Sequence, residues 1–155
     1  MNYWLTVHWP LRVDERINVA WRNWIFIAEG WEASGQRIHP DDRVFIYETE
    51  SAPRIREGTH LIERRPGRKG IVALATVITP LKYERGINPE VLEDGRERCW
   101  SYRARTHTDQ ESILSLVDLR NLLHKPGFSA RVPGGLMRLE EAQFNRILRR
   151  FIQEE

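Results

Sequence analysis

A chain of 155 residues, 41% of them hydrophobic and 30% charged, has the composition of one folded domain that buries a core without disulfides or metal ions. Its formal net charge of +2 does not by itself indicate a nucleic-acid partner, and a single cysteine excludes an internal disulfide. The longest apolar stretches are too short to span a bilayer, and the first residues lack the basic region and cleavage site of a signal peptide. We therefore expect a single cytoplasmic domain over residues 1–155, with no membrane partner.

The first predicted element is a strand over residues 2–9, in which side chains alternate between two faces until Pro10 ends the strand. Leu5 and Trp9 share one face, which we assign to the interior of the fold. Trp4 lies on the opposite face, where we expect it to pack under a helix. Because Trp9 also stands at the end of the strand, where a barrel opens, core and pocket roles are both open for it.

A helix is predicted over residues 14–29, with Asp14 as its cap and Gly30 just beyond its end. The run Ile-Phe-Ile at residues 25–27 is less typical of a helix. One apolar stripe of this helix is expected to face the core, and its members are Ile17, Ala20, Trp21, Trp24 and Ala28.

The middle of the chain indicates two strands joined by a long charged segment. A turn at residues 40–42, Pro-Asp-Asp, leads into a short apolar strand over residues 43–47. Residues 49–69 are rich in Arg, Pro and Gly, which predicts a long loop or mobile hairpin with a strand near residues 61–62. Residues 70–78 are the clearest buried strand of the chain.

Residues 80–98 are predicted to be irregular, because glycine, proline and charged residues interrupt every apolar pattern there. Residues 99–107 alternate again as a strand, and a short helix begins near Leu116 and stops before Pro126. The best helix begins at about Leu139, and its core-facing stripe contains Phe144, Ile147, Leu148, Phe151 and Ile152. These elements predict an α+β fold, a small curved or closed sheet of about five to six strands flanked by helices.

Arginine supplies 21 of the 24 basic residues, and many of the arginines lie in short runs. The planar guanidinium binds phosphate in a bidentate manner and stacks on rings, which favours nucleic acid as a partner. A solvated arginine-rich surface without a ligand is the competing interpretation. The residues expected to contact phosphate are Arg64, Arg65, Arg68, Lys69, Arg103 and Arg105.

Six tryptophans exceed what one small core needs, and five of them fall within the first 31 residues. The natural flat partner for surplus aromatic planes in a basic protein is a nucleobase. Trp31, in a polar loop outside the helical stripe, and Trp100, at the start of a later strand, are the preferred walls of a base pocket, with Trp9 as a third. Packing in the core is the competing interpretation for the other candidates, which are Trp21, Trp24, Tyr47 and Tyr102.

Catalytic patterns are thin in this sequence. The five histidines are scattered without metal-ligand spacing, and no glycine-rich phosphate loop or nucleophile elbow is present. The neighbouring carboxylates Asp41 and Asp42 are interpreted as turn formers rather than as a catalytic pair. We therefore expect a binding module rather than an enzyme, with no cofactor and no metal.

Five motifs in a fixed order carry a resemblance to a known family. They are the Asn-Tyr-Trp-Leu strand at residues 2–5, the turn and strand at residues 39–47, the strands at residues 70–78 and 100–105, and the ending at residues 130–151. Together they resemble the EVE domain family, relatives of the YTH and PUA-like domains, over nearly the whole chain. Family members often have Gly-Asp where this chain has Asp-Asp, and the tryptophan-rich segment also differs from the family.

The resemblance implies a small PUA-like β-barrel flanked by helices, with a pocket at one side of the barrel. It also implies a reader that holds a modified base, such as a methylated cytosine or adenine in DNA or RNA, in an aromatic cage that includes Trp100. Such a pocket must stack the flipped base and enclose its methyl group. A separate effector such as a nuclease is a possible partner. The alternatives are an RNA-processing or nuclease-type PUA-like enzyme, and a module that binds a small molecule or a protein.

Overall fold

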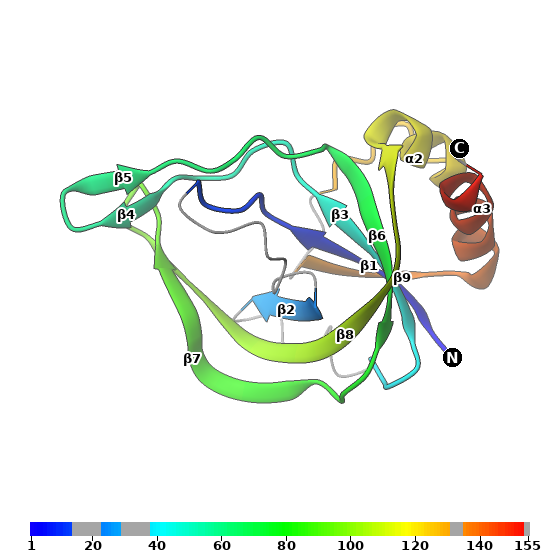
Figure 1. The fold of residues 1–155 in the computed structure, drawn as a ribbon, viewed down its shortest axis with the longest axis horizontal. Coiled ribbons are helices and arrows are strands. Elements are labelled where there is room, and N and C mark those ends of the chain that lie inside the picture. The colour runs from blue at the N-terminus through cyan, green and yellow to red at the C-terminus, as the bar shows by residue number, and fades with distance from the viewer. Residues whose placement is uncertain (14–22, 29–37, 131–134, 154–155) are drawn as a thin grey trace.

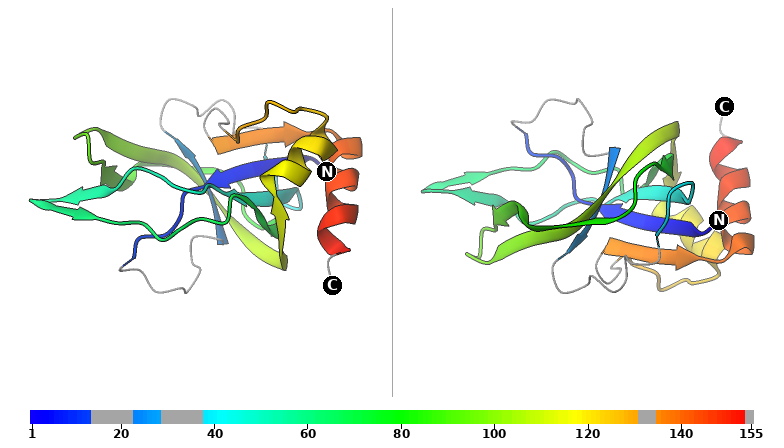
Figure 2. Two further views of the ribbon diagram at one scale, coloured as in Figure 1. Left: turned by 90° about the horizontal axis from the view of Figure 1, so that it is seen from above. Right: turned by 90° about the horizontal axis from the view of Figure 1, so that it is seen from below.

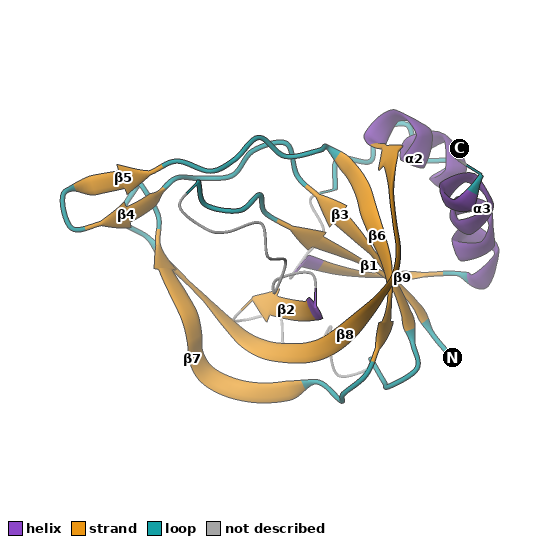
Figure 3. Cartoon of the chain, in the orientation of Figure 1, coloured by secondary structure: helices purple, strands orange, loops and turns teal. Residues whose placement is uncertain are grey.

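The computed structural model describes residues 1–13, 23–28, 38–130 and 135–153 of the chain. The elements found in these residues are strands β1 (Tyr3–His8), β2 (Trp24–Ala28), β3 (Arg43–Glu48), β4 (Ile55–Glu57), β5 (His60–Ile62), β6 (Gly70–Val77), β7 (Lys82–Val91), β8 (Glu97–Ser115) and β9 (Leu136–Leu139), and helices α2 (Leu116–Leu123) and α3 (Glu141–Ile152). Figure 3 shows that strands predominate over helices in the described chain. None of the helices in this described part is long and apolar enough to cross a bilayer.

Seven of the described strands form one mixed sheet in the order β2-β8-β6-β3-β1-β9, with β7 paired to β8 as well. The pair β1–β3 is parallel, whereas the other pairs of this sheet are antiparallel. The sheet curls into a half-barrel, with α2 and α3 beside one end and the separate β4–β5 hairpin at the other (Figure 1). This confirms the predicted α+β curved sheet with flanking helices, although the sheet has seven described strands in place of about five to six.

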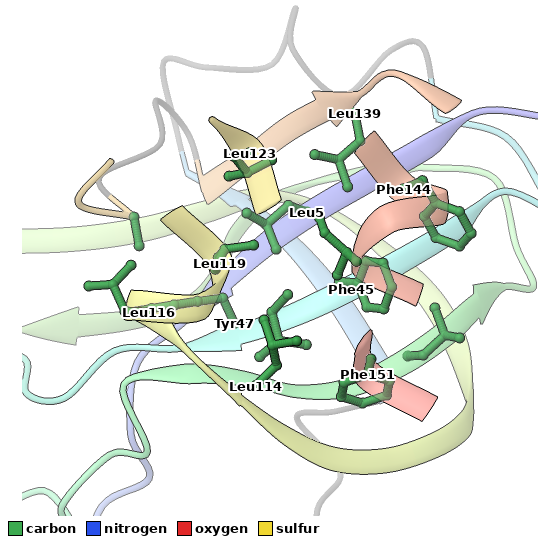
Figure 4. Packing of buried hydrophobic residues seen from close by; sticks show 14 residues of the cluster. Leu5, Phe45, Tyr47, Leu114, Leu116, Leu119, Leu123, Leu139, Phe144 and Phe151 are labelled. Atoms are coloured by element: carbon green, nitrogen blue, oxygen red, sulfur yellow. The ribbon is translucent and has the colours of Figure 1, made fainter. Parts of the chain in front are cut away.

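Two hydrophobic clusters occupy the two faces of the sheet. The helix-side cluster joins the sheet to α2 and α3 (Figure 4), and its members include Leu5, Phe45, Tyr47, Leu114, Leu119, Phe144, Ile147 and Phe151. The inner cluster fills the curl of the sheet, and its members include Trp4, Ile25, Ile27, Val44, Ile46, Val77 and Ala104.

The prediction for the two faces of the first strand is therefore wrong. Leu5 lies in the helix-side cluster, whereas Trp4 lies in the inner cluster, so their expected places are exchanged. Both side chains are buried, with exposed fractions of 0% for Leu5 and 3% for Trp4. Because helices cover one face of the sheet and the curl encloses the other, alternation alone does not tell which face is which.

The helix predicted over residues 14–29 is contradicted where it can be compared. Residues 24–28 form β2, while residues 14–22 lie outside the described part of the chain. The period of burial is two, since Ile25 and Ile27 are fully buried, and Trp24 is half-buried. The β-branched run thus outweighs the helical spacing of the stripe, and Trp24 is not a residue of a core-facing helix.

The segment at residues 80–98 is not irregular as predicted, because residues 82–91 form β7. Among the described strands β7 pairs with β8 alone, with shifts of register, and at such an edge position Pro89 disturbs little. The last helix starts at Glu141 rather than at Leu139, which belongs to β9. The strands predicted at residues 43–47 and 70–78, the hairpin within residues 49–69 and the helix near Leu116 are confirmed.

The two acidic residues of the turn play different structural parts. Asp41 has a φ of 74°, a left-handed conformation that favours glycine. The buried carboxylate of Asp42 accepts three hydrogen bonds, from the backbone N–H of Asn2 (2.8 Å), the indole N–H of Trp4 (3.0 Å) and the backbone N–H of His39 (2.9 Å). This confirms that the pair forms a turn and joins it to β1.

Candidate functional site

The pairing of β2 with β8 brings the N-terminal aromatic segment beside the later one. Trp24 is in register with Arg105, Phe26 with Arg103, and Ala28 with Trp100, so residues about 75 positions apart in sequence become neighbours in the sheet. On the other edge of β8, Lys82 of β7 is in register with Arg103. Directly opposed residues of antiparallel strands project to the same face.

The outer face of these three strands is both aromatic and basic. Since Ile25, Ile27 and Ala104 point into the inner cluster, their neighbours along the strands point outward. We name this surface the outer aromatic-basic face, and its residues are Trp24, Phe26, Lys82, Arg103 and Arg105. The guanidinium carbon of Arg103 lies 4.6 Å from the centroid of the Trp24 ring, within the range of a cation–π contact. This stack holds one arginine over a half-buried ring, while Arg105 and Lys82 are exposed.

A second aromatic-basic contact lies where β1 has ended. The guanidinium carbons of Arg64 and Arg98 lie 5.0 and 5.2 Å from the centroid of the Trp9 ring. The Arg64 guanidinium donates to the carbonyl oxygens of Pro53 at 2.7 Å and Pro10 at 3.1 Å. It also forms an ion pair of 2.9 Å with Glu90, and the Arg64 side chain is only 7% exposed. Arg64 therefore joins three segments of this fold rather than facing solvent.

Three more of the predicted phosphate ligands lie in the loop that follows β5. Backbone hydrogen bonds fix this loop, from Arg65 N–H to a carbonyl oxygen at residue 11 (2.7 Å) and from Gly67 N–H to the carbonyl oxygen of Glu50 (2.9 Å). Arg68 and Lys69 are exposed, and the Lys69 ammonium lies 3.5 Å from the Glu50 carboxylate. A braced loop with exposed cationic ends suits a phosphate contact.

The remaining predicted pocket residues fall in different places. Trp21 and Trp31 lie outside the described residues, and for Trp100 and Tyr102 the structure describes the backbone in β8 but not the side chains. Tyr47 is 2% exposed in the helix-side cluster, and burial raises the pKa of its hydroxyl. Tyr47 thus lies on the face of the sheet that is turned away from the curl.

Tyr83 of β7 is an aromatic residue that the sequence reasoning missed. It is in register with residue 102 of β8, which is in register with Ile27, so Tyr83 and Ile27 project to the same inner side. Ile27 is fully buried, whereas Tyr83 is 52% exposed at the edge of the sheet. A single aromatic among charged residues, in a segment with glycine and proline, gives little signal of a strand, so nothing in the sequence marks it.

Beside the start of α3, the half-barrel has an open hollow of about 520 Å³, lined by residues 1–3 and 138–141. Its polar contact is a hydrogen bond of 3.0 Å from Arg138 to the side-chain oxygen of Asn2. In the described part of the chain, no group of three or more His, Cys, Asp and Glu residues is placed to hold a metal ion.

No family model and no curated protein matches this chain. Solved structures do. Human THYN1 in complex with 5-methylcytosine-containing DNA is 12% identical, with a TM-score of 0.60 and coverage of 100% of both chains. The fold of this chain is therefore PUA-like. A hypothetical protein from Leishmania major is 14% identical, with a TM-score of 0.59 over 99% of this chain and 96% of that chain. A protein from Pseudomonas putida is 16% identical, with a TM-score of 0.58 over 95% and 97% of the two chains. The PUA-like α+β fold that the resemblance implies is thus confirmed over nearly the whole chain, with the expected small barrel present as a half-barrel.

Proposed function

We propose that this protein is a nucleic-acid reader that binds a modified, methylated base flipped into an aromatic pocket. The observation that carries the proposal is the likeness in fold, over the full length of both chains, to human THYN1 in complex with 5-methylcytosine-containing DNA. The outer aromatic-basic face and the exposed cations after β5 add the surface chemistry that a nucleic acid requires. The proposal includes membership of the EVE domain family and a binding role without catalysis.

The pocket of this proposal has walls from Trp31 and Trp100, with Trp9 and Tyr102 beside them. Stacking on aromatic planes contributes about 1–3 kcal/mol per base, which offsets the few kcal/mol needed to extrude a base from a duplex. Tyr83, exposed on the inner side at the edge strand, adds a plane at the mouth of this pocket.

The phosphate contacts of the proposal are Arg65, Arg68, Lys69, Arg103 and Arg105. Arg64 is left out, because its guanidinium is buried against Trp9 and bonded to two carbonyl oxygens and to Glu90. Each cation that neutralises a phosphate releases counterions, so binding weakens as salt rises.

The test is a fluorescence titration of oligonucleotides that differ only in one methyl group, on cytosine or on adenine. We expect one methylated form to bind at least about tenfold more tightly than its unmodified twin, a difference of about 1.4 kcal/mol. Trp100→Ala is expected to abolish this preference. The matched control Trp24→Ala, on the outer face, is expected to weaken both forms equally and keep the ratio.

Equal affinity of the wild-type protein for methylated and unmodified strands would contradict the proposal. Cleavage of the oligonucleotide during the titration is the outcome that the nuclease-type alternative predicts. Binding that neither salt nor competitor nucleic acid changes is the outcome expected for a module that takes a small molecule or a protein.

A further inference from the structure

The β4–β5 hairpin projects away from the half-barrel, at the end opposite α2 and α3 (Figure 1). Figure 2 shows the same projection from above and from below. We name residues 55–62 the arm. The six residues 56–61 are all exposed, although Ile55 at the root of the arm is 3% exposed and bridges to Leu92.

Ion pairs hold the root of the arm. Arg54 bonds to Glu63 and to Glu93, each at 3.0 Å, so it joins the two strands of the arm to the turn after β7. Arg12, from the segment after β1, forms an ion pair of 2.8 Å with Glu57 on the arm itself. Together with the buried Ile55 and its bridge to Leu92, these ion pairs tie the root of the arm to the barrel, although each partly exposed pair contributes little by itself.

The tip of the arm contributes little to the core. Gly58 has a φ of 60°, and a Cβ placed there would meet no atom within 4 Å. The residues that follow it, Thr59, His60 and Leu61, are exposed, and Leu61 is 38% exposed. Leu61 therefore remains accessible to a partner at the outward-pointing tip.

The dimensions of the arm fit one class of nucleic acid. Each of its strands has three residues and spans about 10 Å. The major groove of B-form DNA, about 12 Å wide and about 8.5 Å deep, admits a two-stranded β-ribbon. The major groove of A-form RNA is deep and narrow, and side chains cannot read it. Arg65, Arg68 and Lys69 follow directly in sequence, where they can meet the phosphates at the edge of a groove.

We infer that the arm enters the major groove of double-stranded DNA beside the bound base, so that the substrate is duplex DNA rather than RNA or a single strand. This inference rests on the proposed function, whose pocket is formed at the barrel. The pocket recognises the modified base, and the arm recognises the form of the nucleic acid around it.

The test compares three probes of the same sequence, a DNA duplex, an RNA duplex and a DNA single strand, each prepared with one 5-methylcytosine and again without it. Wild-type protein is expected to bind the DNA duplex at least about tenfold more tightly than the RNA duplex. The double variant His60→Glu/Leu61→Glu places two negative charges at the tip without touching Arg54 or its partners. It is expected to lose about tenfold in affinity for the DNA duplex and less than about twofold for the other two probes.

The matched control is Val117→Glu/Asn121→Glu on α2, at the other end of the molecule, where both residues are exposed. It makes the same change in charge and is expected to alter no affinity by more than about twofold. A neutral variant, His60→Ala/Leu61→Ala, is expected to reduce the same preference with an unchanged melting temperature.

Equal binding of DNA and RNA duplexes by the wild type, or equal weakening of all three probes in the arm variant, would overturn the inference. A protein that ignores the methyl group, yet loses only its DNA-duplex affinity in the arm variant, would contradict the proposed function and leave the arm's role intact. If the protein discriminates the methyl group but the arm variant binds all probes like the wild type, the role of the arm would be contradicted and the proposed function would be supported.

Discussion

Asp42 illustrates how one buried side chain links the N-terminus, the first strand and a turn. Its carboxylate accepts the N–H groups of Asn2, Trp4 and His39 at 2.8 to 3.0 Å, with 2% of the residue exposed. We expect Asp42→Ala to lower the free energy of unfolding by about 3 kcal/mol, because three donors lose their acceptor. Urea unfolding measures this, with the exposed Asp94→Ala as a control that is expected to change stability much less.

Asp41 tests the neighbouring position of the same turn. Because its φ is 74°, Asp41→Gly is expected to hold or raise stability by up to about 1 kcal/mol, whereas Asp41→Ala lowers it by about 1 kcal/mol. Thermal unfolding of the two variants checks the order. Equal melting temperatures would show that the left-handed backbone is not strained here. Gly-Asp, the pair common in the EVE family, would suit this conformation.

The burial of Tyr47 is expected to make the stability of the fold depend on pH in the alkaline range. Burial is the main cause of its raised pKa, and Glu50 adds to the effect, whereas Arg120 opposes it. A raised pKa means that the neutral phenol is favoured by folding. This stabilisation is present below the pKa of the unfolded state, about 10, and is lost as the pH rises through the folded-state pKa.

Tyr47→Phe is therefore expected to weaken the loss of stability between about pH 8 and about pH 11. The measurement is urea unfolding of the wild type and the variant at both pH values. Tyr83→Phe is the matched control, because Tyr83 is 52% exposed, and it is expected to follow the wild type. Identical pH dependence of all three proteins would contradict the account of Tyr47.

At the scale of elements, β6 and β8 depend on a close approach of their backbones. A Cβ at Gly70 would lie 2.4 Å from the carbonyl oxygen of Leu114, whereas one at Gly127 would meet nothing within 4 Å. Gly70→Ala is expected to cost about 3 kcal/mol of unfolding free energy, since a backbone oxygen cannot move aside easily. Gly127→Ala is expected to be neutral or slightly stabilising. Equal effects in a denaturant titration would contradict the described packing of the two strands.

The success of the sequence reasoning follows the strength of local pattern. Residues 71–75 form one continuous apolar run, so β6 was predictable, and the spaced leucines after residue 115 predicted α2. β7 was not predictable, because an edge strand needs no apolar face and tolerates proline. β2 was mistaken for a helix because its tryptophan also fits a helical spacing.

The residue types of the candidate site, aromatic and basic, were predictable from the sequence, but their positions relative to one another were not. Nothing local distinguishes Arg64, whose guanidinium is buried against Trp9, from the exposed Arg68 four residues later. The approach of Trp24 to Arg103 depends on the pairing of β2 with β8, a long-range contact that no short motif encodes. Likewise, only the register across β7, β8 and β2 shows Tyr83 on the inner side.

At the scale of the molecule, internal ion pairs neutralise part of the arginine excess. Arg12, Arg54 and Arg64 each bond to glutamates around the root of the arm and the start of the barrel. The net charge of +2 therefore does not show where the other basic residues lie on the surface. Exposed cations remain on the outer aromatic-basic face and in the loop that ends at Lys69, and these are the ones that the proposal assigns to phosphate.

In the proposed function, one pocket reads a methylated base while a separate basic surface holds the phosphates. The most direct measurement is the dissociation constant for methylated and unmodified duplexes at about 50 and about 200 mM salt. Both affinities are expected to fall steeply with salt, while their ratio stays at about tenfold or more, because the methyl contact carries no charge. A ratio near one at either salt concentration, or affinities that do not change with salt, would contradict it.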